Sequence, residues 1–346
     1  MSVASPTRRA VMIWSALLVA GLAGWTYSAW ALDAERAWRA MLINFVYFTP
    51  LAAGLVLWPA IVRLGRGEWA KGLEEAPLAG IAFAPVSLVA FAALWLGQSH
   101  WAVHDQTLSN AGWLNPNFLF ARDAAALVVY WVLAGWFVRT WPNPPRRLAA
   151  WLAFAYAMVF TLLGFDLIMA LDPKGYSTLL GWYYFVTGAY AAISAWTLMM
   201  LLRPAPTTST EQRADFAKLI LAFSLLSMYM MFSQLIVMWY ENLPPEARFI
   251  VPRLRFEEYG WVSAALVPTI YLGPLVLLLS FRAKRSRGWL GFMAVMLLVM
   301  LWVERWWLVT PMVKGPIAFG LPEFSMTLAF LSAGILAMRV YNRRTG

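Results

Sequence analysis

The chain has 346 residues, of which 62% are apolar and 13% are charged, and its mean hydropathy is +0.63. Soluble domains carry about 25% charged residues, so this composition excludes the soluble, fibrous and disordered classes. The absence of cysteine excludes disulfides, cysteine-ligated zinc, iron–sulfur clusters and thiol catalysis in this chain, and two histidines nearly exclude internal bis-histidine haems. The sequence therefore predicts a polytopic membrane protein that uses carboxylates, arginines, aromatic side chains and two imidazoles, or a partner's cofactor.

Apolar stretches of about 20 residues, the length that crosses a hydrocarbon core of about 30 Å, predict ten transmembrane helices. Turn-forming segments such as Pro142–Pro145 and Asp172–Gly175 separate them. We therefore expect the whole chain to be one all-α integral membrane domain. The predicted spans lie near residues 10–31, 38–62, 77–97, 118–138, 147–170, 179–202, 216–239, 259–281, 288–308 and 322–340.

The basic residues divide unequally between the two ends of these spans. One set of ends carries 18 of the 27 basic and 5 of the 17 acidic residues, and the opposite ends carry the remaining 9 and 12. By the positive-inside rule this predicts that both termini are cytoplasmic, in a bacterial inner membrane. The positive charge is spread over six short segments, so no nucleic-acid partner is expected. The first span also resembles a secretory signal with a candidate cleavage site at Ala29–Ala31, but its full length favours a retained helix.

Ionisable side chains inside a bilayer are costly, and they are usually functional or paired. In the predicted orientation they gather in the outer third of the spans, which indicates a polar site open to the outer face. No acidic relay leads from it to the cytoplasm. We expect Asp166 and His100 to be the catalytic groups. The further candidates for a quinone site or a proton route are Arg122, Asp123, His104, Asp172, Gln234, Tyr240 and Glu241.

Two pairs among these candidates leave alternatives open. His100 and His104 would share one face of a helix and could bind a metal. Two ligands do not complete a metal site, so no metal is expected, and a hydrogen bond to a headgroup, quinone carbonyl or partner, or a structural role, is favoured. Asp166 and Asp172 lie about 240° apart around a helix, so they are expected to point in different directions. Asp166 either accepts a proton or forms a salt bridge with Arg122 or Arg305.

Glu304 and Arg305 are adjacent charges in the apolar ninth span. Adjacent positions on a helix do not face each other, so we expect each side chain to pair with a different neighbouring helix in a structural role. Trp302 and Trp306, four residues apart, are expected to cover one shared face.

Three segments together resemble a membrane subunit of alternative complex III, the bacterial quinol:cytochrome c oxidoreductase. They are FDLIMALDPKGYSTLLGWYYF (165–185), FSQLIVMWYENLPPE (232–246) and WVERWWLVTP (302–311), and NPNFLFARDAAALVVYW (115–131) also fits. The chain is most similar to the second of the two polysulfide-reductase-like subunits. The resemblance implies two four-helix bundles flanked by two helices, no redox centre bound by this chain, and partner subunits that carry haems and iron–sulfur clusters.

The residues and the resemblance predict an integral subunit of a respiratory quinol:electron-acceptor oxidoreductase. It would contribute to a quinol site or a proton route on the outer face, with quinone, lipid and the other subunits as partners. The alternative is a scaffold subunit whose sister subunit binds the quinol. A secondary transporter is less expected, because transporters place polar sites near the bilayer midplane.

Overall fold

The computed structural model describes residues 8–102, 112–172, 177–203, 208–241, 250–312 and 319–345. Within these ranges every regular element is a helix, and ten helical segments are long and apolar enough to cross a membrane. The chain is therefore an all-α, multi-pass membrane protein, as its sequence predicts. The α-helices are α1 (Arg8–Tyr27), α2 (Ala34–Gly65), α3 (Glu75–Leu78), α4 (Ala84–Leu96), α5 (Pro116–Arg139), α6 (Arg146–Leu167), α7 (Leu180–Leu201), α8 (Thr210–Glu241), α10 (Gly260–Leu266), α11 (Gly273–Leu279), α12 (Phe281–Arg285), α13 (Arg287–Val309) and α14 (Leu321–Thr345).

Short 3-10 and π segments extend or join these helices. Two of the spans are composite: the third is built from α3, η2 and α4, and the eighth from α10, η5 and α11. Pro268 and Pro274 lie in the eighth span, and a proline removes a backbone donor, which explains the π geometry of η5. The connecting segments are η1 (Ser28–Leu32), η2 (Ala79–Phe83), η3 (Gln98–His100), η4 (Met169–Leu171), η5 (Val267–Leu272) and η6 (Thr310–Met312).

The predicted spans agree with the observed helices to within a few residues, and the largest difference is at the start of α8. This helix begins at Thr210, whereas hydropathy places the span from residue 216. Ser209 and Gln212 form a reciprocal capping box, in which each side chain accepts the other's backbone N–H at 3.0 Å. The added turns are polar, so a hydropathy window does not detect them.

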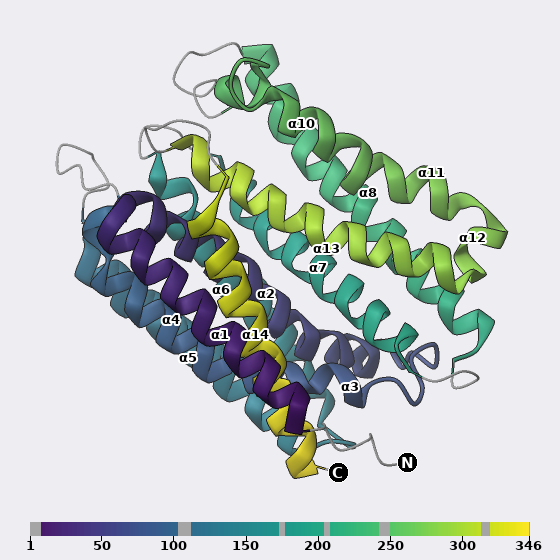
Figure 1. Cartoon of the computed structure of the whole chain (residues 1–346). Helices are drawn as coiled ribbons and strands as arrows, with labels where there is room; N and C mark the ends of the chain where they lie inside the picture. The colour runs from purple at the N-terminus through teal and green to yellow at the C-terminus, as the bar shows by residue number, and fades with distance from the viewer. Residues whose placement is uncertain are drawn as a thin grey trace.

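The helices form two bundles and a flanking pair (Figure 1). The first bundle contains α2, α4, α5 and α6, and the second contains α7, α8, α10–α11 and α13. Contacts of α7 with α2 and α6 join the bundles, while α1 and α14 pack along each other. This is the arrangement that the resemblance implies. The span of α2 is 94% buried and that of α1 only 6%, so α2 is central and α1 peripheral.

The flanking pair is held together by small residues. A Cβ atom on Gly21 of α1 would lie 2.6 Å from the carbonyl oxygen of Ser325 on α14, closer than any real side chain could sit. One turn away, a Cβ on Gly24 would lie 2.9 Å from Ser325 Cβ. Such close backbone contact is a main source of helix association within lipid, where no hydrophobic drive exists between helices.

Candidate functional site

One end of the first bundle, where α5 begins and α6 ends, holds a cluster of one arginine and two carboxyl groups, which we call the carboxylate cluster (Arg122, Asp123 and Asp166). Asp166 is 3% exposed near the C-terminus of α6, and its Oδ2 lies 2.6 Å from Nη2 of Arg122 on α5. The indole of Trp113 donates to Asp166 Oδ1 at 3.2 Å, and its ring centroid lies 3.8 Å from Arg122 Cζ. The predicted salt bridge between Asp166 and Arg122 is thereby confirmed.

Asp123 completes the cluster from the next position on α5. Its side chain is fully buried, with Oδ1 3.5 Å from Arg122 Nε, and it lies close enough to Asp166 for the two carboxyls to interact. Asn115 caps the start of α5 by accepting the backbone N–H groups of Asn117 and Phe118, which fixes this end of the helix. Two carboxyls thus share one guanidinium in a buried site.

The space beside this cluster is small. A gap of about 20 Å³ adjoins Asp166 and is otherwise lined by aromatic and aliphatic side chains such as Trp101, Phe120 and Leu171. Pockets for drug-sized ligands usually measure about 300–1,000 Å³, so a quinone ring does not fit here without rearrangement. The cluster can hold a proton or a water molecule more readily than a substrate.

The other candidates whose side chains are described make different contacts. His100 is exposed in η3, and its ring lies parallel to that of Trp38 at a centroid distance of 6.2 Å. Gln234 is buried and its Oε1 accepts the hydroxyl of Ser177 at 2.9 Å, whereas Tyr240 is 82% exposed. His104 and the side chain of Glu241 lie outside the described residues. Asp166 is therefore grouped with Arg122 and Asp123, and among the described residues neither His100, Gln234 nor Tyr240 forms a hydrogen bond or ion pair with these three.

Asp172 lies beyond the end of α6 at Leu167 and directly follows η4, so the predicted helical spacing from Asp166 does not apply to it. It is buried, and it acts electrostatically on Arg253, a residue that the sequence analysis missed. Arg253 is fully buried and donates through Nε to the carbonyl of Trp307 at 3.1 Å and through Nη2 to that of Leu308 at 2.7 Å. It thus caps the C-terminus of α13.

Burial lowers the pKa of the Arg253 guanidinium to about 9, against the opposing effects of the nearby Tyr259 and Asp172. The group is still charged at neutral pH. Arg253 stands between predicted spans, in a segment where an arginine is ordinary, so hydropathy gives no sign of its burial.

The second buried ion pair corrects one expectation. Glu304 and Arg305 were predicted to diverge, yet Arg305 Nη1 lies 2.6 Å from Glu304 Oε2. The long arginine side chain curls back along α13, because in a fully buried site the adjacent carboxylate is the nearest counter-charge. Its other arm behaves as predicted: Nη2 crosses to α7, where it donates to Thr187 Oγ1 at 2.7 Å and to the carbonyl of Tyr184 at 3.2 Å.

A network of tyrosines surrounds this pair within the second bundle. The hydroxyls of Tyr183 on α7 and Tyr271 in η5 lie 2.8 Å apart, and the carbonyl of Tyr271 accepts the hydroxyl of Ser224 on α8. Glu304 interacts electrostatically with both tyrosines. Tyrosine is counted among the hydrophobic residue types of the composition, so this polar centre does not stand out in the sequence.

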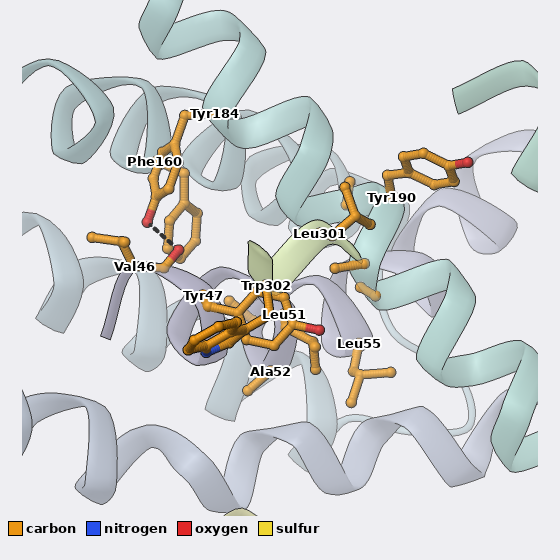
Figure 2. Packing of buried hydrophobic residues seen from close by; sticks show 14 of the residues in the cluster. Val46, Tyr47, Leu51, Ala52, Leu55, Phe160, Tyr184, Tyr190, Leu301 and Trp302 are labelled. Atoms are coloured by element: carbon orange, nitrogen blue, oxygen red, sulfur yellow. Dashed lines mark hydrogen bonds between the residues drawn. The ribbon is translucent and has the colours of Figure 1, made fainter. Parts of the chain in front are cut away.

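A cleft of about 580 Å³ opens between α13 and α14, with α2 at its base; we call it the apolar cleft. Figure 2 shows four of its lining residues, Tyr47, Leu51 and Ala52 from α2 and Trp302 from α13, gathered where the two helices meet. On α14 the lining residues recur every three or four positions from Phe324 to Met338, a stretch of about 21 Å at 1.5 Å per residue. The cleft is therefore elongated along the helix.

The polar groups in the walls of the apolar cleft are bonded within the protein. Asn44 Oδ1, on α2, accepts both the indole N–H of Trp302 at 3.0 Å and the hydroxyl of Thr327 at 2.9 Å. The hydroxyl of Tyr47 donates to the carbonyl of Leu298 at 2.6 Å. Trp302 and Trp306 both face Phe319, with centroid distances of 5.6 and 6.3 Å, which confirms their predicted shared face.

In the described part of the chain, no group of three or more His, Asp or Glu side chains lies close enough to hold a metal ion. Comparison with models of known protein families gives no match, and comparison with curated proteins gives none.

Proposed function

We propose that this chain is an integral subunit of a respiratory quinol-oxidising complex of the bacterial inner membrane, with both termini in the cytoplasm, and that it holds the isoprenoid chain of a quinol in the apolar cleft. The observation that carries this proposal is the shape and lining of that cleft. Its volume of about 580 Å³ lies within the usual range for small-molecule sites.

The walls of the cleft suit a hydrocarbon chain better than a polar ligand. Aromatic and aliphatic side chains dominate its lining, and its Trp302, Thr327 and Tyr47 donors are already bonded to protein oxygens. A chain that lies along α14 over about 21 Å replaces loosely ordered lipid without leaving any polar group unpaired. A compact polar substrate would gain no hydrogen bond here.

The electrons of a quinol would pass to a partner subunit. This chain has no cysteine and only two histidines, so it offers few ligands for a redox centre. The resemblance to alternative complex III supports partners that carry haems and iron–sulfur clusters. In such a complex this subunit contributes binding and orientation, and the cofactor chemistry belongs to its neighbours.

Protons released by quinol oxidation would need an acceptor near the outer face. The carboxylate cluster provides two buried carboxyls and one guanidinium, so it has a net charge of −1 without a bound proton and of zero with one. We propose that the cluster holds a proton on the outer side of the membrane.

A scaffold role is the second candidate, and one observation favours it. Both oxygens of Asp166 are already bonded, to Arg122 and Trp113, and only a gap of about 20 Å³ adjoins them. These bonds fix α5 against α6, as a purely structural ion pair would.

Two valines on α13 allow a matched test. Val299 lines the apolar cleft, whereas Val295, one turn earlier and similarly exposed, does not. We expect Val299→Trp to raise the KM for a long-chain quinol several-fold and to leave the KM for a short-chain quinol analogue unchanged. Val295→Trp is the control, and it should change neither KM. The measurement is quinol oxidation by the complex purified in mild detergent. An unchanged KM in Val299→Trp would leave only the scaffold role, and a purified chain without haem-bearing partners would refute membership of the complex.

A further inference from the structure

A second cavity lies at the opposite end of the molecule from the carboxylate cluster, where α2 ends and α5 connects to α6. It measures about 490 Å³, and we call it the basic cavity. Three arginines line it, from the C-terminal turn of α2, the residue just beyond it, and the first position of α6. The side chains that carry the argument are Arg63, Arg66, Arg146, Glu74 and Trp141.

Two of these guanidinium groups are held in place by backbone carbonyls. Arg63 donates through Nε to the carbonyl of Pro144 at 3.0 Å, and Arg146 donates through Nη2 to the carbonyl of Leu64 at 2.7 Å. The bonds run in opposite directions between α2 and the α5–α6 connection, so each segment positions the other's cation. Each guanidinium keeps further N–H groups for a ligand, because arginine has five donors.

The charge in the cavity is not balanced by the protein. Within the described residues, none of the three arginines forms a salt bridge with a carboxylate. Glu74 also lines the cavity, but its Oε2 accepts the backbone N–H of Leu73 at 3.0 Å. Three cations and one anion leave a net positive site, and a rigid guanidinium fork matches phosphate oxygens.

The surroundings point to a lipid. The cavity lies at the ends of the second, fourth and fifth spans, which is the depth of the phospholipid headgroups. Pro59 and Val62 give it an apolar side toward the hydrocarbon. The indole N–H of Trp141 is buried without a hydrogen-bond partner among the described residues, and tryptophan is the side chain most typical of this interface.

We infer that the basic cavity binds the phosphate headgroup of an anionic phospholipid, with its acyl chains along Pro59 and Val62. Basic pockets between transmembrane helices are a known form of lipid recognition, and each added cation strengthens the attraction to an anionic headgroup. The site is separate from the apolar cleft, so this inference and the proposed function can fail independently.

The test is native mass spectrometry of the full chain, purified in mild detergent, with phosphatidylglycerol or phosphatidylcholine of identical acyl chains. We expect phosphatidylglycerol to bind at least about tenfold more tightly. The triple variant Arg63→Gln, Arg66→Gln and Arg146→Gln should abolish that preference. A control that removes three charges elsewhere at the same end, Arg147→Gln, Arg282→Gln and Lys284→Gln, should retain it.

A single substitution distinguishes the loss of a ligand contact from misfolding of the triple variant. The side chain of Arg66 makes no hydrogen bond or salt bridge to the described residues, so Arg66→Gln removes a charge without a structural bond, and we expect a partial loss of about threefold. Equal binding of the two lipids, or equal loss in the control variant, would overturn the inference. Displacement of the lipid by inorganic phosphate at comparable concentration would identify a soluble phosphate as the ligand and overturn it as well.

Discussion

Three buried or half-buried arginines show how single residues adapt to an apolar interior. Arg122 bonds to Asp166 and lies over an indole, Arg305 bonds to its own neighbour and to α7, and Arg253 bonds to carbonyls at the end of α13. An interior cation without partners would cost several kcal/mol. Each arginine therefore links two segments that are distant in sequence.

We predict that Arg305→Ala lowers the yield of folded protein before it alters turnover. The substitution strands the Glu304 carboxylate in a fully buried position, and loss of one partner of a buried pair typically costs about 3–5 kcal/mol. The measurement is the amount of purified subunit together with turnover per assembled complex. Arg282→Ala, at an exposed position, is the control. Normal yield with lost turnover would contradict this structural role.

We predict that Asp166→Asn slows quinol oxidation at least about tenfold while the protein still assembles. An amide oxygen can still accept the Trp113 indole N–H, and Arg122 keeps Asp123, but the amide cannot hold the proton. Turnover of the purified complex is the readout. Asp215→Asn, which disrupts an exposed pair with Lys218, should have no effect. Unchanged turnover in Asp166→Asn would favour the scaffold role.

At the scale of helices, the length of the apolar stretches predicts all ten spans, because a bilayer imposes a minimum length on every crossing helix. They do not predict which polar side chains meet. The contact of Asp166 with Arg122 follows from shared depth, whereas the curling of Arg305 onto Glu304 depends on side-chain flexibility and full burial. The apolar cleft arises where α13 and α14 diverge, and no sequence periodicity marks such a divergence.

We predict that Gly21→Leu separates α1 from α14. Even a Cβ atom at this position would lie 2.6 Å from a carbonyl oxygen of α14, so a leucine forces the helices apart. The unfolding temperature in detergent should fall, and the connection between α1 and α2 should become more sensitive to protease. Val19→Leu, at a position that is 66% exposed on the same helix, should change neither. An unchanged unfolding temperature and protease pattern in Gly21→Leu would show that the close contact is dispensable.

At the scale of the whole molecule, the two bundles differ in where their polar groups lie. The carboxylate cluster is at one end of the first bundle, the basic cavity is at its other end, and the tyrosine network lies inside the second bundle. The start of α1 and the end of α14 lie at the same end of the helix array (Figure 1). The first and last spans therefore have their terminal ends on the same side of the helix array, as an even number of spans requires.

We predict that a reporter fused after Gly346 is active only if it functions in the cytoplasm, and that one fused after Asp33 is active only if it functions in the periplasm. The reason is the excess of basic residues at one set of ends. A pair of alkaline phosphatase and fluorescent-protein fusions at each position provides the measurement. Alkaline phosphatase activity in the fusion at Gly346 would contradict the predicted cytoplasmic location of the C-terminus.

The amide oxygen of Asn44 limits how far the apolar cleft can widen. This one atom accepts Trp302 from α13 and Thr327 from α14, so both walls are tied to the same point on α2. A ligand wider than a single hydrocarbon chain would have to break one of these hydrogen bonds. The Trp302 indole N–H or the Thr327 hydroxyl would then face hydrocarbon without an acceptor. If the proposed site holds a hydrocarbon chain, we expect it to admit chains of limited cross-section and of variable length.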